Sequence, residues 1–354
     1  MTDVVKVPKG PPAPPEGATR PAHLELTGDD ASKRDGVLAH FQADGYTLDG
    51  TPLSDEEKFW LTDECLQRYL RASKWVEATT KMRLEATLKW RREYGFGTDA
   101  MAPDAVEMEN ETGKQIIFGY DNQRHPALYL LPSRQNTDGP PRQIRATVFM
   151  LERVLDLCGP GVESLALLIN FADRAKNPSL STARSVLNIL QEHYPERLGA
   201  AYIVKVPWMV NLFFKAILPF VDPKTRTKLF FNPDVVKDGL MPSESLLKAD
   251  GWDGACNFEY DHSVYWPALV QLCAEKHAKE HKAWRDLGGK IGESEWAIKV
   301  RASEDVHEHT TASSEVVDDA PAATPPVLDM PNFETPAEAA VPAEGLLAQA
   351  EEHA

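Results

Sequence analysis

A continuously apolar segment in the second half of the chain limits the possible folds most strongly. It runs from Trp208 to Phe220 and includes Met209, Val210, Leu212, Phe213, Phe214, Ile217 and Leu218. A surface helix usually carries apolar residues along one stripe, whereas here almost every position is apolar. The segment must therefore be buried on all sides, lie on a membrane, or alternate between these states. A core helix is the ordinary interpretation.

The same segment is too short to span a bilayer, which requires about 20 apolar residues. Asn211 and Lys215 also interrupt it. Any contact with a membrane is therefore expected to be peripheral.

The net charge of −16 is concentrated near the C-terminal end. No Lys or Arg follows Arg301, and the acidic residues beyond it carry −12, which leaves −4 for the residues before them. Basic patches on the folded part can still meet lipid phosphates. The cysteines are widely spaced and no signal peptide precedes them, so we expect free thiols in a reducing cytoplasm. They are Cys65, Cys158, Cys256 and Cys273.

Composition predicts a disordered tail at each end of the chain. Residues 1–35 are rich in Pro and Gly, and residues 302–354 are rich in Ala, Pro, Glu and Thr. Neither segment can bury enough apolar surface to offset the entropy of the chain.

Periodicity divides the remainder into two parts. Residues 36–110 are expected to form a small helical subdomain, in which Asp63 can cap a helix and Gly95 can end another. From 111 to 285 short apolar strands alternate with helices, which indicates an α/β sheet covered on at least one face. We expect a helix from Val264 to about Lys282 to end the folded region.

Sequence motifs of nucleotide-binding and hydrolytic enzymes are absent. This disfavours an enzyme. Cys273, His277 and His281 would align on one face of a helix and are the best candidates for metal ligands. The Lys and Glu residues between them favour a solvated helix instead, so we expect no metal.

Charged residues stand on both sides of the apolar segment. Glu196 and Arg197 precede a predicted strand, while Lys224, Arg226 and Lys228 follow the segment. Taken singly, the first two could form an ion pair at a helix end, and Lys228 could be an ordinary surface lysine. In combination, fixed charges beside an apolar flap suggest a site for an amphiphile.

Several segments resemble one known family. Tyr-Pro-Glu-Arg-Leu-Gly at 194–199, Pro-Phe-Val-Asp-Pro-Lys at 219–224 and Leu-Arg-Ala-Ser-Lys at 70–74 are similar to CRAL-TRIO lipid-binding proteins. Residues 129–137, 149–154 and 260–267 resemble the pleiotropic-drug-resistance branch of the fungal phosphatidylinositol transfer proteins. The resemblance implies a mixed, mostly parallel sheet with a helical lid over a large apolar pocket, preceded by a small helical subdomain.

The resemblance also implies a headgroup site. Glu196, Thr225 and Lys228 would bind the inositol phosphate, because a carboxylate accepts from inositol hydroxyls while a lysine and a hydroxyl donate to phosphate oxygens. Asp121 matches a further acid near the headgroup, and Arg197 matches a family arginine. One basic contact of some members is replaced by Ser73.

Leu165 and Leu167 occupy strand positions where members that exchange phosphatidylcholine place a Ser and a Thr. Leucine cannot donate to a phosphate, and desolvating a phosphate without donors would cost several kcal/mol. We therefore expect weak binding of phosphatidylcholine, with a sterol as a possible second ligand in the same cavity.

The function implied is non-enzymatic transfer of phosphatidylinositol, or its presentation to enzymes such as a phosphoinositide kinase. The ligand would be the bound phospholipid, with no cofactor, metal or nucleic acid. The protein would be cytoplasmic and would associate peripherally with membranes, such as those of the endoplasmic reticulum, the cell periphery or lipid droplets. The alternative is a lipid-sensing scaffold that recruits a partner through the acidic tail. The predicted residues of the pocket and gate are Leu165, Leu167, Trp208, Met209, Leu212, Phe213, Phe214, Ile217 and Phe220.

Overall fold

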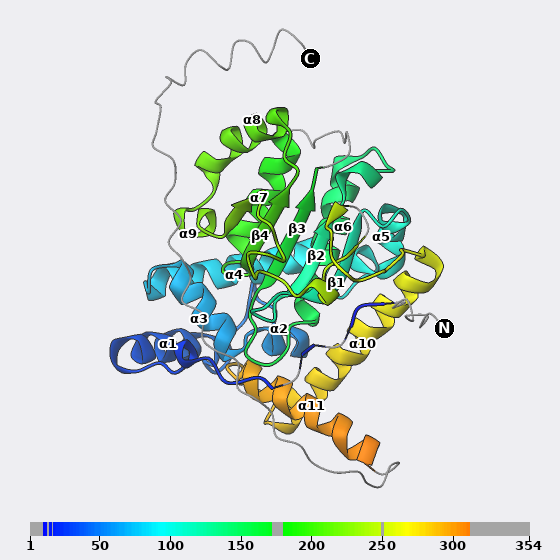
Figure 1. Ribbon diagram of the computed structural model, residues 1–354. Helices are drawn as coiled ribbons and strands as arrows, with labels where there is room; N and C mark the ends of the chain where they lie inside the picture. Colours follow the sequence, from blue (N-terminus) through cyan, green and yellow to red (C-terminus); the bar gives the residue numbers. More distant parts are fainter. Residues whose placement is uncertain (1–9, 13, 16, 172–179, 249–250, 312–354) are drawn as a thin grey trace, which may run out of the picture. The chain divides into compact units, whose positions relative to one another are not determined.

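The computed structural model describes residues 10–12, 14–15, 17–171, 180–248 and 251–311 (Figure 1). The predicted disorder of residues 1–9 and 312–354 lies outside this range.

Within the described residues, five strands form one sheet in the order β1-β2-β3-β4-β5. The first two strands are antiparallel, and each later pair of neighbours is parallel. The inner strands are almost continuously apolar, as expected for strands covered on both faces. The predicted mixed, mostly parallel sheet is confirmed. The strands are β1 (Gln115–Tyr120), β2 (Pro126–Leu130), β3 (Leu165–Asn170), β4 (Leu198–Val204) and β5 (Leu229–Phe231).

Helices connect the parallel strands, because each such connection must return along the sheet. The crossovers carry α6 (Pro140–Asp156), α7 (Leu180–His193), and then α8 (Trp208–Ile217) with α9 (Pro223–Arg226). α6 packs on β1 and β2, and α7 lies between α6 and α8 (Figure 1). Short 3-10 turns occur at Ala22–Leu24, Asp99–Met101, Pro132–Arg134, Leu218–Phe220 and Ser243–Ser245.

The helical N-terminal part has its own apolar core. It contains α1 (Gly28–Phe41), α2 (Asp55–Trp60), α3 (Asp63–Ala72) and α4 (Glu77–Tyr94), and α5 (Pro103–Asn110) leads to the sheet. Thr62, not Asp63, caps α3, since its hydroxyl accepts from the Cys65 amide at 3.1 Å. Gly95 ends α4 with a left-handed φ of +92°, as predicted.

Folded structure extends further at both ends than predicted. α1 begins at Gly28, inside the predicted tail of residues 1–35, because Val37 and Phe41 are buried in the helical core. After α10 (His262–Asp286) a further helix, α11 (Glu295–Thr311), packs with Ile298 and Ala302 against Trp284. The predictions that the fold ends near Lys282 and that disorder starts at 302 were therefore wrong.

The predicted solvated face of α10 is partly buried. Cys273 and His281 lie in the interior, and His277 and His281 both approach the Glu56 carboxylate of α2, at 3.1 and 3.4 Å. All four cysteines are free and buried, as expected for structural thiols. No described helix is long and apolar enough to cross a bilayer.

Candidate functional site

The candidate site lies at the N-terminal ends of the parallel strands, and this end of the sheet is called the edge below. Parallel strands start at one edge, so the residues that precede them in the sequence are brought together. Glu196 and Arg197 precede β4, and Thr225 and Lys228 precede β5. Four of the five predicted headgroup residues thus meet at one edge, although they come from separate segments.

Glu196 is the centre of this cluster. Its carboxylate accepts from Arg71 Nε of α3 at 2.5 Å and from Lys224 Nζ of α9, and 16% of its side chain is exposed. Burial opposes ionisation, but the hydrogen bonds from Lys224 and Arg71 outweigh it and lower the pKa of Glu196. The residue has a φ of +59°, a conformation that is uncommon outside glycine and is often found at functional sites.

Lys228 is a partly buried cation beside Glu196. Its ammonium donates to the Leu198 carbonyl, and burial is the main cause of its lowered pKa. Thr225 lies one turn away, and its carbonyl accepts from the Lys228 amide at 3.0 Å. The amide of Thr225 donates to Asp222, which caps α9. A cation with a weakened hydration shell and a nearby hydroxyl suit the phosphate of a ligand.

Arg197 and Asp121 have other partners. Arg197 donates from Nη1 to the Glu163 carbonyl at 2.8 Å, so it does not pair with Glu196. Asp121 is buried in the β1–β2 turn, where its carboxylate contacts the amide and the ring of His125, both at 2.9 Å. That ring covers Gly199, where an added Cβ would lie 2.6 Å away. Asp121 therefore reaches the edge indirectly, through His125.

The apolar segment forms α8 and the following 3-10 turn, and its side chains divide between two environments. Phe214 packs edge-on against Phe171 and Phe231, with ring centroids 6.1 and 5.2 Å apart, while Ile217 is half-buried. Trp208, Leu212 and Phe220 are 77, 51 and 49% exposed. The alternative that this segment is a core helix, buried on all sides, is therefore excluded. The side chains of Met209 and Phe213 lie outside the described part.

Contacts with α7 fasten the end of the apolar segment. The Arg184 guanidinium lies 4.2 Å from the Phe220 ring centroid, and Gln191 donates to the Phe220 carbonyl at 2.8 Å. Together with the ring contacts of Phe214, these contacts hold the segment at its middle and at its C-terminal end.

The two leucines that replace hydroxyl residues lie on β3. Leu167 is half-buried in the cluster beneath α8 that includes Phe214, whereas Leu165 is buried in the main core. Leu167 therefore contributes to the apolar cluster that α8 covers. The large apolar pocket predicted there stays a prediction.

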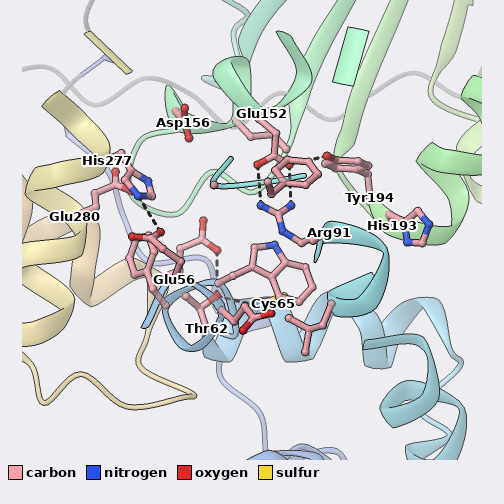
Figure 2. A pocket seen from close by; sticks show the side chains of 18 of the residues that line it. Glu56, Thr62, Cys65, Arg91, Glu152, Asp156, His193, Tyr194, His277 and Glu280 are labelled. Atoms are coloured by element: carbon pink, nitrogen blue, oxygen red, sulfur yellow. Dashed lines mark hydrogen bonds and ion pairs between the residues drawn. The ribbon is translucent and has the colours of Figure 1, made fainter. Parts of the chain in front are cut away.

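A cavity of about 1010 Å³ lies between the helical N-terminal part and helices α6, α10 and α11 (Figure 2). Its lining includes Pro195 and Arg197 beside the candidate site. Several of its charged groups are paired: Arg91 donates to Glu152 at 3.0 and 3.2 Å, and the Tyr194 hydroxyl donates to the same carboxylate at 2.6 Å (Figure 2). Burial opposes ionisation of Glu152, but Arg91 and Tyr194 outweigh it and lower the pKa to about 2. Because these paired charges neutralise each other, we interpret the cavity as part of the packing between helices and not as a ligand site.

Sequence reasoning missed two residues of the candidate site. Arg71 lies in the segment that carries the family resemblance, yet nothing in its spacing relates it to Glu196. Glu163 precedes β3 just as Glu196 precedes β4, and that shared position at the start of a parallel strand was an available signal.

Two family models match the chain: the CRAL/TRIO N-terminal domain over residues 33–86 and the CRAL/TRIO domain over residues 110–244. The chain is 38% identical over 299 residues to the phosphatidylinositol transfer protein PDR17 of Saccharomyces cerevisiae, which covers 77% of this chain and 84% of that protein.

Two further relatives are similar over shorter lengths. A CRAL-TRIO domain-containing protein of Schizosaccharomyces pombe is 50% identical over 251 residues, or 70% of this chain, but the chain spans only 24% of that relative. The SEC14 cytosolic factor of Candida glabrata is 27% identical over 212 residues, covering 52% of this chain and 69% of the relative.

Proposed function

This chain belongs to the CRAL-TRIO family, in the branch of PDR17-like fungal proteins, and we propose that it binds phosphatidylinositol and transfers it between membranes. PDR17 is named a phosphatidylinositol transfer protein, and most of its length aligns with this chain. The observation that carries the proposal is the convergence of Glu196, Thr225 and Lys228 at the edge where the parallel strands begin.

The chemistry of this edge fits an inositol phosphate. Each oxygen of the Glu196 carboxylate accepts from one cation in the structure, which leaves further lone pairs for inositol hydroxyls. In this proposal Lys228 and Thr225 donate to the phosphate oxygens. In this proposal the protein is not an enzyme, because its residues hold and release a ligand without making or breaking bonds.

We further propose that the segment Trp208–Phe220 is the gate for the acyl chains. A diacyl lipid carries on the order of 30 methylenes at about 0.8 kcal/mol each, so crossing water unprotected would cost more than about 20 kcal/mol. The gate would close over the chains in water and turn onto the bilayer during exchange. Its exposed Trp208 and Leu212, with Lys215 and Arg226 nearby, suit an anionic lipid surface.

The second ligand is proposed to be apolar. Leu167 offers no donor to a phosphate, so phosphatidylcholine would enter with its phosphate unpaired. A sterol would avoid this cost. We place the protein in the cytoplasm at membrane surfaces, where it supplies phosphatidylinositol by transfer or by presentation to a phosphoinositide kinase.

A vesicle transfer assay tests the proposed function. Glu196→Gln and Lys228→Ala should each lower the transfer of phosphatidylinositol about tenfold, because each removes a charge-assisted contact with the headgroup. Glu57→Gln is the matched control, since Glu57 forms a similarly buried pair with Arg92 outside the site. The unaltered protein should transfer phosphatidylcholine at least about tenfold more slowly than phosphatidylinositol. Equal rates for both lipids, or unchanged transfer in both site variants, would refute the assignment.

A further inference from the structure

Glu163 lies next to the headgroup cluster and has no role in the proposed binding. It stands in the loop between α6 and β3, and 11% of its side chain is exposed. One carboxylate oxygen accepts from Arg68 Nη1 at 2.7 Å, and both oxygens lie 3.3 Å from Arg71 Nη2. The His23 ring approaches the carboxylate at 3.0 Å. A single carboxylate thus gathers two arginines of α3.

Glu163 remains charged in this environment. Burial opposes its ionisation, but the hydrogen bond with His23 and the charges of Arg68 and Arg71 outweigh burial and lower the pKa to about 2. Arg68 is itself almost fully buried and has a second acidic partner, Glu295 of α11, at 3.1 Å. Arg68 therefore does not depend on Glu163 alone.

Arg71 is held between two carboxylates. Nη2 faces Glu163, and Nε donates to Glu196 at 2.5 Å. Glu163 thereby fixes the plane of the guanidinium and draws part of its charge away from Glu196. Without Glu163, Arg71 would pair with Glu196 alone and compete with the ligand hydroxyls for its lone pairs. The Nη1 atom of Arg71 is buried and has no hydrogen-bond partner among the described residues, so the guanidinium is not saturated by the protein.

We propose that Glu163 is a positioning residue for the lipid headgroup, which acts through Arg71 to set the orientation and the accepting capacity of Glu196. This inference rests on the proposed function and deepens it. Glu163 would affect the inositol-bearing ligand specifically, because Arg71 and Glu196 face the headgroup end of the site and not the sheet face beneath α8.

A double-variant cycle in the full chain tests the proposal, with transfer of phosphatidylinositol between vesicles of phosphatidylcholine as the readout. Glu163→Gln should lower transfer about tenfold, and Glu57→Gln should change it by less than about twofold. In the Glu196→Gln background, Glu163→Gln should have less than about a twofold further effect, because its route to the headgroup is already broken. A merely structural residue would give losses that multiply.

Arg71→Lys provides a second test in case Glu163→Gln fails to fold. Lysine keeps the positive charge but cannot bridge two carboxylates in a fixed plane, so it should reproduce the loss of Glu163→Gln. Multiplying losses, or unchanged transfer in Glu163→Gln and Arg71→Lys while Glu196→Gln is impaired, would overturn the positioning role and leave the proposed function standing. Unchanged transfer in both Glu196→Gln and Lys228→Ala would overturn the headgroup site itself.

Discussion

Among individual residues, Glu196 shows how the fold prepares a polar site without exposing it to bulk water. Its carboxylate is largely buried, yet two cations keep it ionised. A buried charge of this kind is tolerated only when its partners are well placed. The site is consequently sensitive to single substitutions that leave the sheet intact.

His193 provides a residue-level prediction on pH. Its ring stacks on Trp90 with centroids 4.1 Å apart, and burial, aided by the charges of Arg83 and Arg91, lowers its pKa to about 4. A lowered pKa in the folded state gives stability that is present above the unfolded value of about 6.5 and is lost as the pH falls toward about 4.

Thermal unfolding should therefore respond to mild acid through this residue. Between about pH 6.5 and pH 5 the melting temperature should fall by about 2–4 °C more in the wild type than in His193→Gln. The carboxylates of Glu152 and Glu163 do not interfere, since their stabilising effect is lost only below the ordinary value of about 4.3. Parallel pH profiles for the two proteins would show the idea to be wrong.

Among the elements, α8 is distinguished by large apolar side chains that face solvent. Trp208 and Leu212 are one helical turn apart and share one face. Exposed side chains contribute little to the folding free energy, so this face is available for a bilayer without loss of stability.

Vesicle binding tests the role of that face. Trp208→Ser should weaken binding to anionic vesicles about tenfold, since burying a large apolar side chain is worth about 1.5–3 kcal/mol. The melting temperature should be unchanged. Met82→Ser is the matched control, because Met82 is 62% exposed on α4, outside the gate. If the two variants bound equally weakly, or if both bound as strongly as the wild type, α8 would have no special part in docking.

α11 is the other element with a testable role. The Glu64 carboxylate accepts from the Trp296 amide at 3.1 Å and the Ser294 hydroxyl at 2.9 Å, which fixes the start of the helix. Glu295 pairs with Arg68 and with Lys299, at 3.1 and 2.7 Å. The helix is thus part of the folded protein, so a truncation meant to remove only the acidic tail must be made after residue 311.

Two truncations separate the helix from the tail. Ending the chain after residue 294 should cost about 3–5 kcal/mol of unfolding free energy, because a buried arginine loses a partner. Ending it after residue 311 should leave the denaturation midpoint and lipid transfer unchanged. Recruitment of a protein partner that disappears with residues 312–354, while lipid transfer survives, would favour the alternative of a scaffold acting through its tail.

Across the whole molecule, the sequence allowed the sheet and most helices to be predicted, because strand patterns are local. The assignment of Glu196, Thr225 and Lys228 to a headgroup site came from specific family motifs and stays a prediction. Arg71 and Glu163 were not predictable in the same way, since their contacts with each other and with Glu196 join residues distant in the sequence. α11 was overlooked because its few buried side chains, such as Ile298, lie in an acidic segment.

Strand direction explains why one edge collects the site. Since β2 to β5 run parallel, every segment that enters them contributes a residue to the same edge, and the crossover after β4 carries α8, the proposed gate, back over the sheet. In the proposed function, one connection between two neighbouring strands, residues 205–228, would therefore join ligand recognition to gating.

The lipid that copurifies with the full chain provides the decisive measurement. Mass spectrometry of the purified protein should find phosphatidylinositol in the wild type and in Glu57→Gln, and its loss in the double variant Glu196→Ala with Lys228→Ala, measured at a temperature where thermal unfolding shows that variant to be folded. Phosphatidylinositol retained at wild-type occupancy in the double variant would contradict the assignment of the headgroup site to this edge of the sheet.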